Sequence, residues 1–199
     1  ETSGLARNRA FAGKYSELVE QKVRYLHHVH QRRVSLVGYS LGGVFAFYAA
    51  HVAPECVRSA ITLSSPLQID PDQPALPGMR MMYRAFGQPY AVSTHHARAR
   101  SRAMQGPPPA PSSCIYSVSD ALVSAQQATM DGDPLHHENI RVPGSHLGLP
   151  FNGRVLWIVA DRLAQREGAW QPFDVSGLPS LLRRGVGAAH ATAVRAASR

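Results

Sequence analysis

The sequence predicts an α/β protein built on a parallel sheet. Residues 32–38 and 57–65 are short, largely apolar runs that end in small residues, which is typical of buried strands. Between them, residues 41–51 are almost wholly apolar and long enough to form a helix. Because parallel strands must be joined by a crossover, which is usually a helix, this order predicts a parallel βαβ unit.

Elements on both sides of this unit extend the same pattern. Residues 14–31 carry apolar side chains at every third or fourth position, which predicts a helix with one apolar face. Residues 113–119 and 138–142 have the composition of two further strands. Residues 152–166 form a clear amphipathic pattern with a helical period. The 199 residues therefore fit one domain.

The composition argues against several classes of protein. Hydrophobic residues make up 44% of the chain and charged residues only 17%, which indicates a packed core rather than disorder. No apolar run approaches the roughly 18 residues of a membrane span. The net charge is +8, and half of this excess lies in the last stretch of the chain, from Arg183 onward. Elsewhere the arginines are scattered, and they lack the aromatic neighbours that stack on bases. We therefore expect no transmembrane segment and no nucleic-acid partner, while the oligomeric state stays open.

The cysteines and histidines do not have the spacing of a metal site. Cys56 and Cys114 are far apart and form no CxxC motif, so we expect two buried thiols. The histidines within residues 27–30 and the segment 131–138 supply nitrogen and oxygen ligands without a recognised spacing. The sequence therefore predicts no metal site.

One serine lies among glycines where a predicted strand meets a predicted helix. The stretch reads Gly-Tyr-Ser-Leu-Gly-Gly, with Ser40 at its centre and glycines at Gly38, Gly42 and Gly43. A sharp turn between strand and helix exposes a serine hydroxyl, and it needs small neighbours. The backbone N–H of Leu41, at the start of the helix, would then point at the oxyanion of an acyl intermediate. The stretch therefore predicts a nucleophile elbow; the alternative is a tight turn that happens to contain serine.

A base and an acid would have to follow later in the chain, each just after a strand. His146 follows the strand at 138–142, and Asp120 follows the strand at 113–119. His146 would accept the proton of Ser40, and Asp120 would orient the imidazole. Three alternatives remain: His146 as a loop residue that caps the last helix, Asp120 as a helix cap, and Asp131 or Asp133 as the acid.

These motifs resemble those of the α/β-hydrolase superfamily over about residues 30–166. The anchors are GYSLGG, YSVSDALV and GSHLGL. The stretches SHLGL and VLWIVADRLAQ, with LARN near the start, are similar to a bacterial group of serine hydrolases of lipase or esterase type. The resemblance implies the α/β-hydrolase fold with its doubly wound, mostly parallel sheet. It also implies a triad of Ser40, Asp120 and His146, and no cofactor.

The chain departs from the family pattern in two ways. The acid motif of the family usually ends in Asp-Gly, and Ala121 takes the place of that glycine. The family also has several strands before the nucleophile strand, and a loop after one of them donates the second oxyanion N–H. Only one loop and one helix precede Val34. We therefore expect an N-terminally truncated domain over residues 1–175 and a basic, flexible tail over residues 176–199.

The segment of about residues 67–111 falls where this fold carries its lid. Residues 66–111 hold nine of the chain's 15 prolines and show no steady apolar period. We expect a lid-like insertion with methionine and aromatic side chains that contact substrate, because methionine-rich surfaces adapt to irregular apolar ligands. Ordinary core packing is the alternative. The residues in question are Met79, Met82, Tyr83 and Phe86.

The function that these features predict is hydrolysis of a small-molecule or lipid carboxylic ester through an acyl-enzyme. An acyltransferase or thioesterase would use the same three residues and differ in the acceptor or the leaving group. A catalytically weak fragment, or a non-catalytic relative that keeps the fold for binding, is the alternative from another class. The compartment stays open: we favour the cytoplasm, and the expected loss of N-terminal sequence leaves a signal peptide possible.

Overall fold

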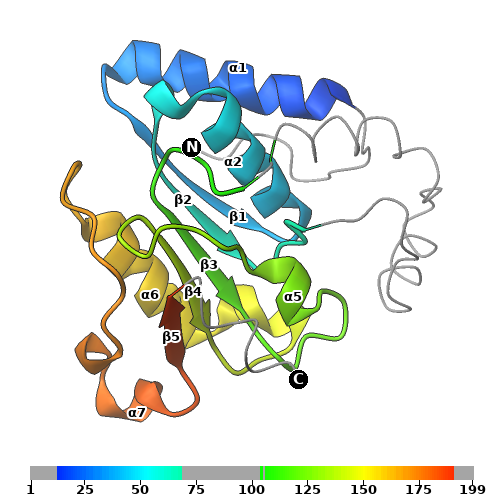
Figure 1. Ribbon diagram of the computed structural model, residues 1–199, viewed down its shortest axis with the longest axis vertical. Coiled ribbons are helices and arrows are strands. Elements are labelled where there is room, and N and C mark those ends of the chain that lie inside the picture. Colours follow the sequence, from blue (N-terminus) through cyan, green and yellow to red (C-terminus); the bar gives the residue numbers. More distant parts are fainter. Residues whose placement is uncertain (1–12, 69–103, 105, 191–199) are drawn as a thin grey trace.

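The residues that the structure describes are 13–68, 104 and 106–190, and in this computed structural model they contain one five-stranded sheet (Figure 1). The strands, in both chain order and sheet order, are β1 (Val34–Tyr39), β2 (Val57–Leu63), β3 (Ser112–Tyr116), β4 (His137–Arg141) and β5 (Gly187–His190). The first four strands run parallel, and β5 runs antiparallel to β4. The predicted α/β class with a mostly parallel sheet is confirmed.

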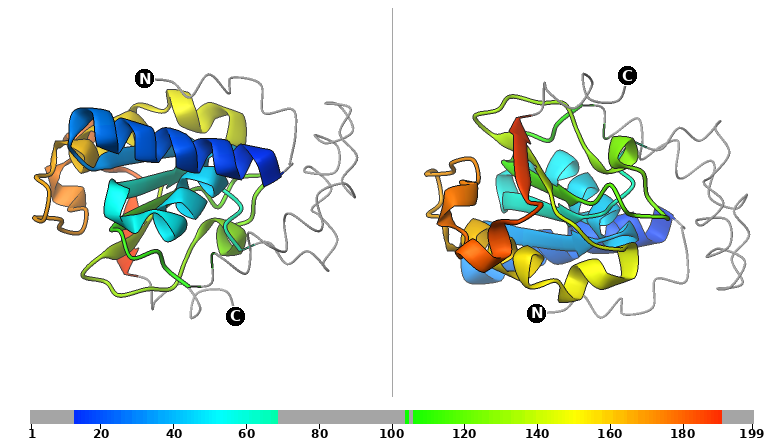
Figure 2. Two further views of the ribbon diagram at one scale, coloured as in Figure 1. Left: turned by 90° about the horizontal axis from the view of Figure 1, so that it is seen from above. Right: turned by 90° about the horizontal axis from the view of Figure 1, so that it is seen from below.

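Helices cover both faces of the sheet (Figures 1 and 2). The helices α1 (Gly13–His30) and α2 (Leu41–Val52) pack on one face, and α6 (Gly153–Ala164) packs on the other. Shorter elements are η1 (Pro54–Cys56), α5 (Ala125–Ala128), η3 (His146–Phe151), η4 (Val175–Gly177) and α7 (Ser180–Arg183). None of the helices in the described ranges combines the length and the apolar character that a membrane span requires.

Small side chains allow α2 to pack closely against the sheet. Ala49 and Ala50 of α2 and Ala60 of β2 are fully buried and belong to one cluster, which Val23 of α1 joins. The apolar stripe expected on α1 is therefore buried in its middle, while Val29, near its end, is 51% exposed. The close packing of α2 matters for the site, because this helix begins directly after Ser40.

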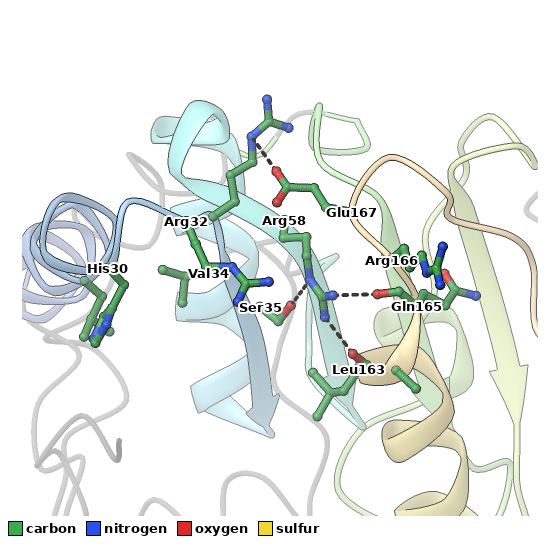
Figure 3. Close-up of a pocket in the computed structure, with 12 residues that line it drawn as sticks. His30, Arg32, Val34, Ser35, Arg58, Leu163, Gln165, Arg166 and Glu167 are labelled. Carbon is green, nitrogen blue, oxygen red and sulfur yellow. Dashed lines mark hydrogen bonds and ion pairs between the residues drawn. The ribbon is translucent and has the colours of Figure 1, made fainter.

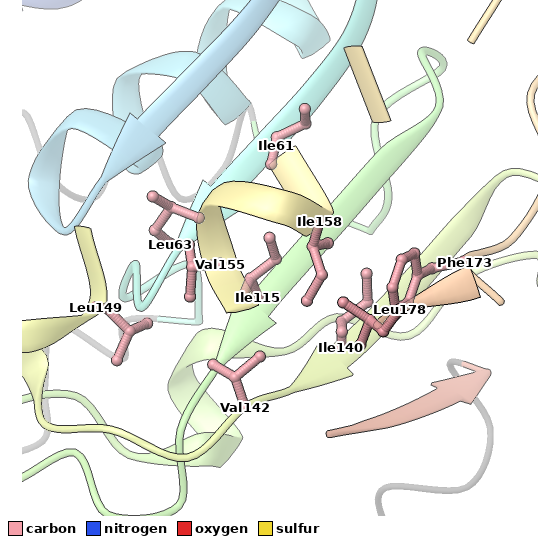
Figure 4. Close-up of a cluster of buried hydrophobic side chains, with 10 residues drawn as sticks. All are labelled: Ile61, Leu63, Ile115, Ile140, Val142, Leu149, Val155, Ile158, Phe173 and Leu178. Atoms are coloured by element: carbon pink, nitrogen blue, oxygen red, sulfur yellow. The ribbon is translucent and has the colours of Figure 1, made fainter. Parts of the chain in front are cut away.

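A larger apolar cluster fills the space between the sheet and α6 (Figure 4). Neighbouring strand residues point to opposite faces, so Ile61 contacts the α6 side while Ala60 contacts the α2 side. The cluster consists of Ile61, Leu63, Ile115, Ile140, Val142, Leu149, Val155, Ile158, Phe173 and Leu178. Leu149 lies three residues after His146, so this core also anchors the loop that carries the histidine.

The parallel register brings the ends of three strands to the same edge of the sheet. Tyr39 at the end of β1 pairs with Leu63 at the end of β2. Leu63 in turn pairs with Ile115 of β3, which pairs with Ile140 of β4. The loops that follow β1, β3 and β4 therefore begin side by side, and these loops contain Ser40, Asp120 and His146.

A buried ion pair joins β4 to α6. Glu138 and Arg162 are almost fully buried, and Arg162 Nη1 donates to Glu138 Oε1 at 2.9 Å. The same carboxylate accepts from Ser113 Oγ at 2.5 Å and from Phe173 N at 2.6 Å. Because each carboxylate oxygen has a donor, the charge of Glu138 is compensated inside the core.

Part of the segment expected to be a loose tail is ordered instead. Residues 175–190 form η4, α7 and β5, and β5 extends the sheet beyond β4. Leu178 lies in the apolar cluster beneath α6 and is 1% exposed. The prediction was wrong here because a four-residue strand rich in glycine and alanine has no periodic pattern, and its order depends on contacts with β4.

Replacement of Arg162 by methionine should lower the free energy of unfolding by about 3–5 kcal/mol, because Glu138 would keep a buried charge without a counter-ion. Urea denaturation monitored by circular dichroism measures this quantity. The double variant Glu138→Gln/Arg162→Met removes both charges and keeps a hydrogen-bond acceptor, so it should lose less than the single variant. A single variant within about 1 kcal/mol of wild type would contradict this account.

Candidate active site

Ser40 occupies a strained backbone position between β1 and α2. Its φ is 53° and its ψ is −123°, values that residues other than glycine rarely adopt. Two hydrogen bonds hold it there: Ser40 N donates to Leu63 O at 2.9 Å, and Gly43 N donates to Ser40 O at 3.1 Å. Strain of this kind persists only where the surrounding structure enforces it, and it gathers at functional sites.

Two of the three glycines around Ser40 are required by close packing. A Cβ on Gly38 would lie 2.4 Å from Gly43 Cα and 2.5 Å from the carbonyl group of Gly42. A Cβ on Gly43 would lie 1.9 Å from Ser65 Oγ and 2.9 Å from Gly38 O. Gly42 differs, because a Cβ there would meet nothing within 4 Å. Close packing therefore explains Gly38 and Gly43 but not Gly42.

The structure brings Ser40, His146 and Asp120 together. His146 Nε2 lies 3.1 Å from Ser40 Oγ, and His146 Nδ1 lies 2.7 Å from Asp120 Oδ2. The His146 side chain is 4% exposed and that of Asp120 is fully buried. Because an ionised carboxylate can only accept a hydrogen bond, Nδ1 carries the proton, and Nε2 is left to accept from the serine hydroxyl.

Asp120 is held in the ionised form and in one orientation. Its Oδ1 accepts from Leu122 N at 2.8 Å and from Val123 N at 2.9 Å, which leaves Oδ2 for His146. Burial alone would raise the pKa of Asp120, but hydrogen bonds from His146 and from these two N–H groups lower it below its ordinary value. Asp120 therefore acts both as a cap of the following turn and as the partner of His146.

The other acids considered from the sequence do not take this place. Asp133 is half-exposed and bonds instead to His136, with Asp133 Oδ2 3.1 Å from His136 Nδ1. Asp131 is exposed. Ala121, which replaces the glycine of the family motif, is not among the positive-φ residues of the described chain. The turn after Asp120 therefore does not need a glycine at position 121.

The backbone N–H of Leu41 is suited to receive a developing negative charge. Leu41 is the first residue of α2, so its N–H has no acceptor within the helix. The amino end of the helix also carries a partial positive charge from the aligned peptide dipoles. An oxyanion formed on a group bound to Ser40 would lie beside this end.

Side chains that the sequence did not single out hold the loop that ends at His146. Tyr39 Oη donates to His146 O at 3.0 Å, and Ser117 Oγ donates to Gly144 O at 2.6 Å. Asn152 Nδ2 donates to Pro143 O at 2.7 Å. Each contact joins residues from different elements, so no local sequence pattern could have indicated it.

The expected lid residues Met79, Met82, Tyr83 and Phe86 lie outside the described residues. Both thiols are free and buried, as expected, and burial raises the pKa of Cys114 to about 12. Within the described ranges, no three His, Cys, Asp or Glu side chains gather as a metal site would require.

A pocket of about 610 Å³ lies at the amino ends of β1 and β2, the edge of the sheet opposite Ser40 (Figure 3). Arg58 in its wall donates to Leu163 O at 3.0 Å, Gln165 O at 2.6 Å and Ser35 Oγ at 2.6 Å. Its charge therefore caps the carboxyl end of α6, where the helix dipole is negative. Arg58 therefore stabilises the end of this helix. The pocket that it lines is separate from the candidate site.

The comparisons with known proteins agree with this fold. A family model for the α/β hydrolase fold matches residues 12–104. No sequence among curated proteins matches this chain. Together with the sheet topology, the family match shows that the chain has the α/β hydrolase fold.

Solved structures resemble the chain at low sequence identity. One of the metagenome-derived lipolytic enzymes LipS and LipT is 18% identical with a TM-score of 0.51, covering 75% of this chain and 70% of that chain. The monoacylglycerol lipase of Paleococcus ferrophilus is 14% identical with a TM-score of 0.49, covering 73% and 75%. The thioesterase domain of the curacin biosynthetic pathway is 16% identical with a TM-score of 0.42, covering 66% and 67%. At sequence identities this low, the likeness to these structures shows the fold alone.

Replacement of Gly38 by alanine should lower the free energy of unfolding by about 1–3 kcal/mol, because the new Cβ would overlap the backbone of Gly42 and Gly43. Thermal or urea denaturation measures the loss. Gly42→Ala is the matched control: the site has open space, and alanine favours the helix, so this variant should be as stable as wild type or more stable. Equal losses in the two variants would contradict the packing argument.

Proposed function

We propose that this chain is a serine hydrolase that cleaves carboxylic esters through an acyl-enzyme. The observation that supports the proposal most is the continuous line of hydrogen bonds from Asp120 through His146 to Ser40 Oγ. It ends on a serine with strained backbone geometry, directly before the first N–H of α2. A nucleophile, a base and an orienting acid in this relation are the requirements for activating a serine.

In the first half of the reaction, Ser40 Oγ attacks the carbonyl carbon of the ester. The hydroxyl proton passes to His146 Nε2, and the Asp120 carboxylate stabilises the resulting imidazolium. The carbonyl oxygen becomes an oxyanion, which the N–H of Leu41 stabilises. As the bond from the carbonyl carbon to the alkoxy oxygen breaks, His146 returns the proton to that oxygen, the alcohol leaves, and the acyl group remains on Ser40.

The second half repeats these steps with water as the nucleophile. His146 Nε2 takes a proton from water while the water oxygen attacks the acyl carbon. The same N–H stabilises the second oxyanion. The bond to Ser40 Oγ then breaks, the serine recovers its proton from His146, and the carboxylic acid is released. A thiol leaving group, or an alcohol in place of water, would follow the same path, so thioesters and acceptor alcohols belong in the substrate panel.

Ser40→Ala should abolish labelling by a fluorophosphonate and lower kcat on p-nitrophenyl esters by at least about 1000-fold, because the nucleophile is removed. Mass spectrometry of the labelled peptide locates the adduct, and release of p-nitrophenol gives the rate. Ser119→Ala, which changes an exposed serine on the loop before Asp120, should keep wild-type labelling. A folded wild-type chain that is neither labelled nor active on esters or thioesters would leave a non-catalytic role as the better account.

Asp120→Asn should lower kcat by about 10⁴-fold with little change in KM, because an amide cannot stabilise the imidazolium and favours the wrong tautomer of His146. Steady-state kinetics on a short-chain p-nitrophenyl ester measures both constants. Asp133→Asn is the control, since Asp133 is half-exposed and bonds to His136. The assignment fails if the two variants have similar kcat values.

A further inference from the structure

Tyr39 links the turn that carries the nucleophile to the loop that carries the base. It is the last residue of β1 and directly precedes Ser40. Its hydroxyl donates to the main-chain oxygen of His146 at 3.0 Å. Its ring also lies beside the imidazole, with the ring centroids 5.0 Å apart and the planes tilted by 40°. One side chain therefore contacts both the main chain and the ring of the candidate base.

The loop from Pro143 to His146 depends on such contacts. Its carbonyl groups at Pro143, Gly144 and His146 accept from the side chains of Asn152, Ser117 and Tyr39, respectively. Gly144 has a φ of +154°, a backbone conformation that residues with a side chain rarely adopt. The three donors come from the end of β1, the end of β3 and the start of α6, so the loop is held from three directions.

We propose that Tyr39 is a positioning residue: its hydroxyl fixes the main chain at His146 and so keeps Nε2 within hydrogen-bond reach of Ser40 Oγ. This inference rests on the proposed function, because it assigns Tyr39 a role in the same proton transfer. It adds a residue outside the three that carry the chemistry. A misplacement of about 1 Å at a reacting group lowers rates substantially, so fixing the main chain of the base has a kinetic effect.

The phenol can act as a donor over a wide pH range. Burial, with a smaller contribution from the nearby charge of Asp120, raises the pKa of Tyr39 to about 12. The hydroxyl therefore stays protonated at neutral and mildly alkaline pH. Phenylalanine at this position would keep the ring beside the imidazole and remove only the donor.

Tyr39→Phe should lower kcat by about three- to tenfold and leave KM within about twofold, which is the range expected for loss of one hydrogen bond. The effect is partial because Ser117 and Asn152 still hold the loop. Steady-state kinetics on a p-nitrophenyl ester and the rate of fluorophosphonate labelling at Ser40 measure it. Tyr25→Phe, an exposed tyrosine on α1, is the matched control and should behave as wild type.

A double-mutant cycle with His146→Ala separates positioning from a general structural role. If Tyr39 acts only through the imidazole, Tyr39→Phe should have no further effect on the residual rate of His146→Ala. A fall of the same size in both backgrounds would overturn the inference. So would a single variant whose kcat stays within twofold of wild type.

A spectroscopic measurement tests the same inference without turnover. The Nδ1–H proton of His146 should give a low-field NMR signal that is lost in His146→Ala. In Tyr39→Phe this proton should exchange with water several times faster, because the loop that shields it is held less firmly. Unchanged exchange would overturn the inference.

Failure of the proposed function would give a different result: the wild-type chain would not be labelled, or Ser40→Ala would hydrolyse esters as fast as wild type.

Discussion

The turn at Ser40 can form only because the backbone at Gly38 lies against that of Gly42 and Gly43. This contact sets how closely α2 approaches β1, and the alanines of α2 extend the close approach along the sheet. The positive φ of Ser40 is unfavourable by itself, and its bond to Leu63 O ties it to the neighbouring strand. The position of Ser40 is therefore the result of sheet and helix packing rather than of the local turn alone.

Residues at the two edges of the sheet hold the two ends of α6. At the amino edge, Arg58 caps the carboxyl end of this helix, and the Glu138–Arg162 pair holds its inner face against β4. At the opposite edge, the side chain of Asn152 accepts from the first turn of α6 and donates to the loop before His146. A buried ion pair is weak evidence for stability, but here it orients the helix from which the histidine loop is held.

The parts of the fold and of the candidate site that could be predicted are those that depend on patterns local in the sequence. Ser40 lies in a motif defined by its own neighbours, and Asp120 and His146 follow strands that a parallel sheet brings side by side. The bond between Tyr39 and His146 joins distant parts of the chain, and the ion pair beneath α6 lies on strand and helix positions that look ordinary in sequence. The strand β5 was missed for a similar reason, because its pairing partner, not its composition, orders it.

Contacts around His146 hold its ring nitrogen Nδ1 and its main-chain oxygen, and they leave Nε2 facing Ser40. Nδ1 is bound to Asp120, whose other oxygen is held by two backbone N–H groups, so the carboxylate cannot rotate without losing them. The main-chain oxygen of His146 is held by Tyr39, whose ring lies beside the imidazole. Only Nε2 is left to accept a hydrogen bond, and the serine hydroxyl is 3.1 Å away. In the proposed reaction, restriction of this kind lowers the entropic cost of proton transfer, and it requires contacts from β1, β3 and α6 together.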